Sequence, residues 1–251
     1  MQRMTPSLLS AAALALCCGC SNYAFSASRT ESIDLSAAQV VKLWAETHNG
    51  DLVFRGAETD AVRGTVELVA RGATPAEAED LLALMEVEHR VEGGVLTLGW
   101  RWSDGKTGWR SGDVSFSLEI PRTLAAELET HNGRIELSGS DGDGRFVTHN
   151  GDIAVDGVFP SLQLETHNGS IRATLAGSGA VVGHVETHNG DIDLAVSQRD
   201  ARLVVDTHNG SIQCLAAAAV RSRRDSHLEA GFGAGSGMLR VRSHNGDVEI
   251  R

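Results

Sequence analysis

The sequence predicts an all-β protein, specifically a parallel β-solenoid with coils of about 18–21 residues and one short helix in its N-terminal part. Three observations support this prediction. The tetrapeptide Thr-His-Asn-Gly recurs along the chain, and from His131 onward its histidines advance by 18, 18, 21 and 20 residues. A near-constant period of this length indicates one structural unit repeated by stacking. Val, Ile and Leu alternate with polar residues around each copy, and 28 glycines against four prolines suit strands joined by tight turns.

Residues 1–19 have the pattern of a secretory signal peptide. Arg3 supplies a positive start, and residues 8–16 form an apolar run that is too short to span a bilayer. The segment that follows resembles a bacterial lipoprotein signal, which implies cleavage after Gly19 and acylation of Cys20. An ordinary cleaved signal is the alternative. Residues 20–32 are small and polar and are predicted to be a lipid-anchored tether, and Ser21 resembles the usual sorting to an outer membrane.

The β-strand-repeat domain is expected over residues 33–251, with an N-terminal part at 33–121. One helix is predicted over residues 74–85, where Thr74 can cap the N-terminus and Glu77 can complete a capping box. Strands flank this helix. His89 falls in the phase of the apolar residues of its strand, which predicts a packed side chain. Three tryptophans follow, Trp100, Trp102 and Trp109. They could stack on sugars or peptides, but a role in covering an open end of the β core is favoured.

The tandem region, residues 122–251, repeats a strand, a corner, a second strand and a looser turn. Asn-Gly suits a turn because both residues tolerate positive φ. Read locally, each Asn-Gly is a hairpin turn within an antiparallel meander. Read globally, the period gives a solenoid in which equivalent residues form ladders about 4.8 Å apart, and asparagine ladders explain why this side chain recurs. The solenoid is therefore favoured, with structural corners at Asn132, Gly133, Asn150, Gly151, Asn168, Gly169, Asn189, Gly190, Asn209 and Gly210.

The regularity weakens after His208. Ser226-His227 is a candidate for a decayed corner, and Ser243–Gly246 closes a last clear unit. Cys214 alternates in phase with Ile212, which predicts a small buried side chain rather than a nucleophile.

The charge balance limits the partners. The chain carries 22 basic and 33 acidic residues, a net charge of −11. This balance argues against nucleic acid and against attraction to an anionic bilayer by charge alone.

The corner histidines are the candidate functional residues. If the coils stack, imidazoles and the carboxylates two residues before them form parallel columns. Such columns could bind Zn²⁺ or Ni²⁺, or respond to pH below about 6.5. A solvated ladder held by stacking is the favoured alternative, because a zinc site needs four convergent ligands. The speculative metal ligands are His131, His149, His167, His188 and His208, and no other cofactor is expected.

The chain resembles the bacterial putative-adhesin β-strand-repeat family, a domain of unknown function on exported and envelope proteins. The resemblance rests on corners such as Thr187–Leu194, on the helix with its following strand and Gly-Gly turn, and on the strand that ends at Pro121. It covers roughly residues 33–251 and implies a solenoid-like domain in the cell envelope, without catalytic residues. Histidine at nearly every corner departs from the more usual Ser or Thr.

These observations together favour a non-enzymatic cell-envelope lipoprotein with a scaffold or adhesin-like domain. The expected location is the outer membrane, facing the periplasm or the surface, and the expected partners are the membrane and an envelope component. One alternative is a divalent-metal-binding or pH-responsive periplasmic protein. The other is a polysaccharide-acting β-helix enzyme, which is disfavoured because the chain has no Gly-x-Ser-x-Gly elbow and Gly231–Gly237 lacks the lysine of a P-loop.

Overall fold

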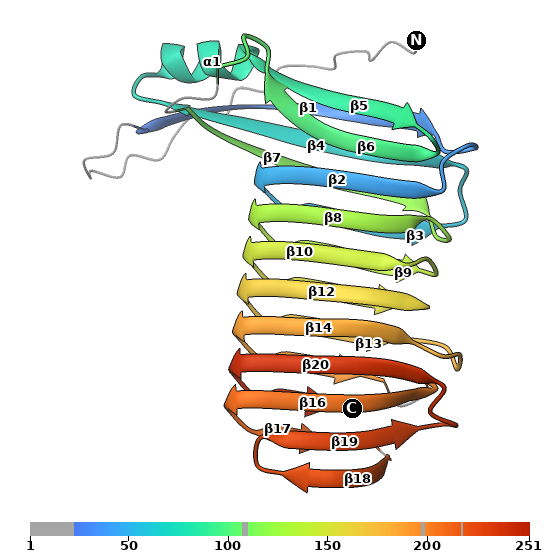
Figure 1. Ribbon diagram of the computed structural model, residues 1–251. Coiled ribbons are helices and arrows are strands. Elements are labelled where there is room, and N and C mark those ends of the chain that lie inside the picture. The colour runs from blue at the N-terminus through green and yellow to red at the C-terminus, as the bar shows by residue number, and fades with distance from the viewer. Residues whose placement is uncertain (1–22, 107–109, 197–198, 217) are drawn as a thin grey trace.

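The computed structural model describes residues 23–106, 110–196, 199–216 and 218–251. The predicted signal peptide, the lipidation candidate Cys20 and Trp109 lie outside these residues. The described chain forms an elongated stack of flat coils, and two β-sheets face each other along the stack (Figure 1).

Each sheet runs the length of the stack, and spatial order differs from chain order at both ends. Sheet 1 contains, in spatial order, β1 (Phe25–Ser36), β4 (Ala61–Gly72), β7 (Ser111–Pro121), β3 (Leu52–Ala57), β9 (Ile135–Ser140), β11 (Ile153–Gly157), β13 (Ile171–Leu175), β15 (Ile192–Ala195), β21 (Val248–Ile250) and β17 (Ile212–Cys214). Sheet 2 contains β18 (Ala219–Arg224), β19 (His227–Phe232), β16 (Ala201–Asn209), β20 (Gly237–Asn245), β14 (Val182–Asn189), β12 (Ser161–Asn168), β10 (Gly144–Asn150), β8 (Ala125–Asn132), β2 (Lys42–Asn49), β6 (Val95–Trp102) and β5 (Met85–Glu92).

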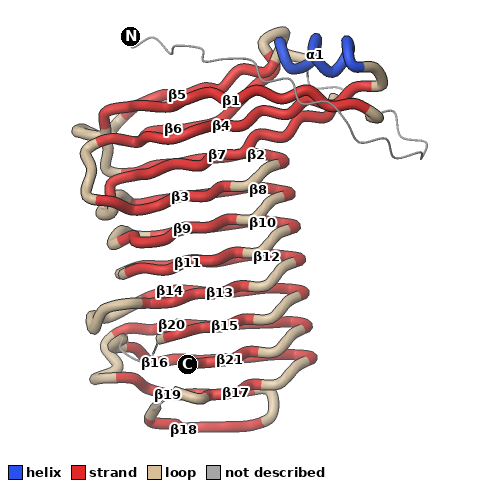
Figure 2. Tube along the Cα trace, turned by 180° about the vertical axis from the view of Figure 1, so that it is seen from behind, coloured by secondary structure: helices blue, strands red, loops and turns tan. Residues whose placement is uncertain are grey.

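The tandem region is a parallel β-solenoid, as predicted, and the antiparallel meander is wrong. Each coil sends one strand through sheet 2, turns at Thr-His-Asn-Gly and returns through sheet 1 (Figure 2). Thr130, Thr148 and Thr166 are direct register partners on neighbouring parallel strands. Identical residues therefore lie above one another, which is the ladder arrangement that the period indicated.

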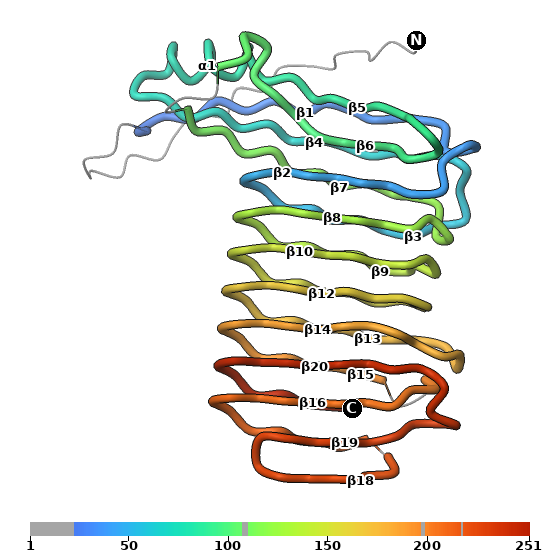
Figure 3. Tube along the Cα trace, in the orientation of Figure 1, coloured from blue at the N-terminus to red at the C-terminus, as the bar shows by residue number. Residues whose placement is uncertain are grey.

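Two coils are inserted out of chain order (Figure 3). The β2–β3 coil lies between β6–β7 and β8–β9, and the C-terminal β20–β21 coil lies between β14–β15 and β16–β17. The register is preserved at both insertions, because Asn49 pairs with Asn132 and Asn245 pairs with both Asn189 and Asn209. The order of corners in the stack therefore differs from their order in the chain at β16. Corners of identical sequence fit any neighbour, so sequence similarity alone does not specify stacking order.

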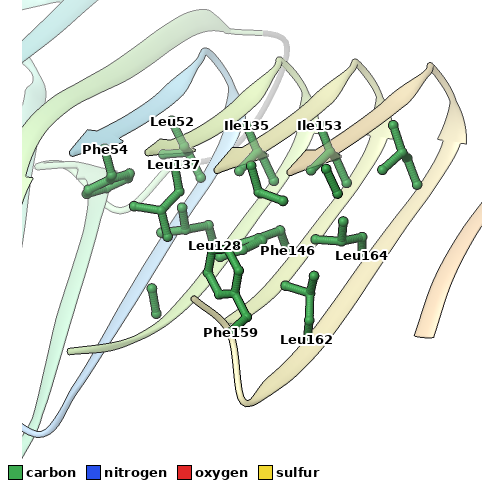
Figure 4. Close-up of a cluster of buried hydrophobic side chains, with 14 of the residues drawn as sticks. Leu52, Phe54, Leu128, Ile135, Leu137, Phe146, Ile153, Phe159, Leu162 and Leu164 are labelled. Atoms are coloured by element: carbon green, nitrogen blue, oxygen red, sulfur yellow. The ribbon is translucent and has the colours of Figure 1, made fainter. Parts of the chain in front are cut away.

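The core lies between the two sheets and is built from columns of aliphatic side chains (Figure 4). Leu52, Ile135 and Ile153 are register partners in sheet 1 and are almost completely buried. Phe146 fills the space beside Gly144, where a Cβ would come within 2.8 Å of the Phe146 ring. Because each coil adds apolar side chains to the same columns, every coil depends on its neighbours for burial.

Antiparallel strands close both ends of the stack. At one end β1 pairs with β4 along its whole length, from Phe25 with Gly72 to Ser36 with Ala61. Strand therefore occupies part of the range 20–32 predicted as tether, because backbone pairing to β4 orders a segment of low hydrophobicity. At the other end β18 and β19 form a hairpin, so Ser226 lies in its turn and not in a decayed solenoid corner.

The helix begins where it was predicted but ends two residues earlier, because Met85 already belongs to β5. Helix α1 (Pro75–Ala83) has Thr74 as its N-cap, and Oγ1 of Thr74 accepts a hydrogen bond from the Glu77 backbone N–H at 3.1 Å. The Glu77 carboxylate in turn accepts from the Ala73 N–H at 2.8 Å, which completes the capping interaction. Ala78 and Leu82 are buried, so the helix covers the core at the β1 end.

Three single side chains for which the sequence made predictions differ in their burial. Trp102 is buried and packs edge-on against Trp100, which agrees with a role in covering the core. The prediction of a packed His89 is wrong: the residue is exposed on β5, which is the edge strand of sheet 2 among the described residues. Cys214 is a free, partly buried thiol packed against the core. Within the described ranges no helix has the length and apolar character needed to cross a bilayer.

Candidate functional site

The corners of the solenoid are built by the threonine and glycine of each tetrapeptide. Thr148 is buried, and its hydroxyl donates to the carbonyl oxygen of Gly133 on the adjacent coil at 3.0 Å. Thr166 makes the same bond to Gly151 at 2.9 Å. A Cβ on Gly151 would lie only 1.9 Å from the Gly133 oxygen, so close approach of backbones excludes any side chain there. This close approach, and not a hairpin turn, explains the glycine of the motif.

The asparagine of each tetrapeptide forms a continuous side-chain ladder. Nδ2 of Asn150 donates to Oδ1 of Asn132 at 2.7 Å, and Nδ2 of Asn168 donates to Oδ1 of Asn150 at 2.8 Å. The C-terminal coil continues the ladder, because Asn245 donates to Asn189 and accepts from Asn209, both at 2.8 Å. The prediction of an asparagine ladder is confirmed, and the amides are occupied by bonds between coils.

The histidines form a second ladder on the outer side of the corner. Successive imidazoles stack face to face, with ring centroids 4.6–4.9 Å apart and planes within 11° of parallel. All of the rings are exposed. In spatial order the ladder consists of His48, His131, His149, His167, His188, His244 and His208.

Stacking changes the acid–base properties of this ladder. The pKa of His149 is lowered from its ordinary value, first because its neighbours displace water and then because His131 and His167 repel a positive charge. The pKa of His244 is lowered by the same displacement of water, by His188 and His208, and by Arg242. Both effects disfavour the imidazolium form.

A shallow groove of about 520 Å³ runs along the corner beside the histidine ladder. Glutamates line it together with the imidazoles, and the column formed by Glu46, Glu129, Glu165 and Glu186 is interrupted by Val147. Two of these carboxylates have cationic or hydrogen-bonding contacts, Glu129 with Arg145 at 3.8 Å and Glu186 with His184 at 2.7 Å.

The structure brings together all five histidines suggested as metal ligands, but as parallel rings. Parallel stacking leaves the ring nitrogens in separate planes, whereas zinc needs ligands that converge on one point. Among the described residues no group of three or more His, Cys, Asp or Glu is arranged to hold a metal ion. The ligand set predicted from the sequence left out His48, which carries the same tetrapeptide, and His244, which carries its Ser-His-Asn-Gly variant.

One family model matches nearly the whole chain, whereas the similarity to solved structures is low. A family model described as Toastrack DUF4097 matches residues 18–251. No curated protein matches the chain. A putative cell adhesion protein from Clostridium sporogenes is 9% identical with a TM-score of 0.49, and the similar region covers 89% of this chain and 98% of that one.

Two further solved structures are similar at 12% identity over 89% of this chain and 97% of theirs. One is a putative adhesin from Bacteroides fragilis, with a TM-score of 0.36, and the other a putative lipid binding protein from Parabacteroides distasonis, with a TM-score of 0.30. At these TM-scores the likenesses carry no argument about fold or function. The family match is different, because it spans every corner, the helix and both ends of the stack, and it confirms the resemblance found in the sequence. The chain belongs to the Toastrack DUF4097 family.

Proposed function

We propose that this chain is a non-catalytic lipoprotein of the cell envelope, whose β-solenoid serves as a rigid scaffold or adhesive surface. The observation that carries the proposal is the use of the repeated polar side chains. Threonine hydroxyls and asparagine amides of the corners bond to neighbouring coils, and the imidazoles stack on one another. The residues that recur most therefore hold the coils together and do not converge on a reacting atom.

The shape of the molecule supports a scaffold role. Sheet 2 stacks eleven described strands, and neighbouring strands lie about 4.8 Å apart, so the stack extends roughly 50 Å. The spatial order of the strands places β1 at one end of the stack and the β18–β19 hairpin at the other (Figure 1). An acyl chain on Cys20 would precede β1, so the solenoid would project its far end away from the anchoring outer membrane.

The experiment tests the anchor and the adhesive role with one substitution. The full chain is expressed in a bacterial host with labelled fatty acid, beside Cys20→Ser and the neighbouring control Cys18→Ser. We expect label and outer-membrane fractionation in the wild type and in Cys18→Ser, and loss of both in Cys20→Ser. Cells that display the anchored chain should attach to surfaces more than cells with Cys20→Ser. Label retained in Cys20→Ser would refute the anchor, and equal attachment would refute the adhesive surface.

A further inference from the structure

Charge is segregated along this acidic chain. Residues 199–251 carry eight arginines against six carboxylates, a net charge of +2 within a total of −11. The preceding 198 residues therefore carry −13. This C-terminal segment forms the β16–β21 end of the stack, far from β1 (Figure 1).

Ion pairing differs between the two regions. Before Arg199, each described lysine or arginine except Arg55 and Lys106 lies within 4.0 Å of a carboxylate, as with Arg63 and Asp34 at 3.1 Å. At the far end of sheet 2, five exposed arginines have no carboxylate partner among the described residues. One of them, Arg223, donates to the Ile212 carbonyl oxygen at 3.5 Å. The other four form the distal arginine patch, which consists of Arg221, Arg224, Arg240 and Arg242.

The four side chains lie on the outer face of sheet 2. Arg240 and Arg242 alternate with the buried Leu239 and Val241 of β20. A register row runs from Arg242 through Asp206 and His227 to Arg224. The Arg221 guanidinium lies 4.0 Å from where a Cβ on Gly231 would stand, which places it over β19.

Three carboxylates beside the patch are already engaged. Glu186 contacts His184 at 2.7 Å, and Asp206 contacts His227 at 2.7 Å. Glu229 is bound by Arg202 at 2.8 Å, with His227 at 3.6 Å. Asp225 lies in the exposed turn between β18 and β19. The distal arginine patch is therefore free to contact an external anion.

The spacing of the patch selects the kind of ligand. Arg242 and Arg224 are three strands apart, about 14 Å, and Arg240 and Arg242 are two residues apart on one strand, about 7 Å. One small anion cannot reach all four guanidinium groups, whereas a polymer with repeated anionic groups can. Guanidinium forms paired hydrogen bonds with carboxylate and sulfate. The described patch carries no Trp, Tyr or Phe on which nucleic-acid bases could stack.

We infer that the distal arginine patch binds an acidic polysaccharide. The inference deepens the proposed function by assigning the class of partner and the face that meets it. The test measures polysaccharide binding by the purified protein, and this binding does not depend on acylation or on attachment of cells. A failure of this inference can therefore be distinguished from a failure of the proposed function.

The test uses the purified full chain in detergent with immobilised polygalacturonate and dextran sulfate. One variant carries R221Q, R224Q, R240Q and R242Q. A control of identical net charge carries R55Q, R63Q, R90Q and K106Q, which replace exposed side chains outside the patch. Circular dichroism and thermal melting check that each variant folds. We expect the wild type and the control to bind alike, salt to weaken binding, and the patch variant to lose about tenfold or more in affinity.

Three outcomes would overturn the inference. One is equal binding by the patch variant and the control. The second is binding to vesicles of anionic phospholipid without binding to either polysaccharide, which would assign the patch to a membrane. The third is self-association of the patch variant without polysaccharide binding by the wild type. That result would mean that the arginines only protect the exposed β18 edge from pairing with other chains.

Discussion

The imidazole ladder makes the stability of the protein dependent on pH. In the folded protein the pKa values of His149 and His244 lie below the ordinary value, whereas the unfolded chain titrates near about 6.5. The unfolded state therefore binds protons first as the pH falls. The contribution of these two histidines to stability is fully present above about pH 6.5 and is lost as the pH falls through their lowered pKa values.

The first prediction concerns His149. Replacing it with Asn removes the central charge and its repulsion with His131 and His167. We expect the melting temperature of His149→Asn to fall less between pH 7.5 and 5.5 than that of the wild type. The exposed His89 lies outside the ladder, so His89→Asn is the matched control and should retain the wild-type slope. An unchanged slope in His149→Asn would show that the stacked rings titrate independently.

The second prediction concerns the corner glycine. Gly151→Ala places a Cβ against the Gly133 carbonyl of the neighbouring coil, and neither backbone can withdraw without breaking the ladder. We expect a loss of about 1–3 kcal/mol or more in the free energy of unfolding. Gly179 has no heavy atom within 4 Å of such a Cβ, so Gly179→Ala should stay within about 0.5 kcal/mol. Urea unfolding of both variants measures the difference, and equal stabilities would contradict the steric explanation.

At the scale of the element, hydrogen bonds between adjacent coils determine how well a coil is held. Thr148→Val keeps the shape and the β-branched side chain but removes the donor to the Gly133 oxygen. We expect a loss of about 1–3 kcal/mol, because the part-buried Gly133 carbonyl loses its partner. Thr174 is exposed on β13, so Thr174→Val controls for the substitution itself and should be nearly neutral. A similar loss in both variants, measured by chemical unfolding, would assign the effect to side-chain type.

At the scale of the whole molecule, the inserted C-terminal coil depends on two adjacent polar residues. Arg199 is buried, and its guanidinium donates to the carbonyl oxygens of Phe159, Ala176 and Ala180, each at 2.9 Å. These bonds fix the connection that skips one level of the stack between β15 and β16. The Asp200 carboxylate accepts hydrogen bonds from the backbone of Gly235 and Ser236 and from the Ser236 hydroxyl. These hydrogen bonds therefore join the loop that leads into β20 to the β15–β16 connection, which leaves one level of the stack for the β20–β21 coil.

The fourth prediction follows from this tie. Asp200→Ala removes the carboxylate that accepts hydrogen bonds from the backbone N–H groups of Gly235 and Ser236. The β20–β21 coil should therefore open more often. We expect faster amide hydrogen exchange in residues 237–250, with β10 and β11 unchanged as an internal control. Equally faster exchange across the whole stack, or protection equal to that of the wild type, would contradict a local stabilisation of the β20–β21 coil by Asp200.

Much of this fold could be predicted from single residues and their spacing. The tetrapeptide specified the coil and the asparagine ladder, and Thr74 with Glu77 specified the helix start. The site was partly predictable, because the histidines do form one column. Whether the ring nitrogens converge on a metal could not be predicted, because it depends on the orientation of the rings in the stacked coils. The strand at Phe25–Ser32 was missed because pairing with β4 gives no local sequence signal.

The sequence by itself determined the repeating unit, because steric and hydrogen-bonding demands at each corner are local and identical from coil to coil. Only the tertiary structure decided the order of stacking. Equivalent corners are interchangeable in sequence, so contacts between distant residues, such as Asp200 with Ser236, determine which coils become neighbours. Tertiary structure also gathered the distal arginine patch, since β18 and β20 are brought to one face by strands that are not consecutive in the chain.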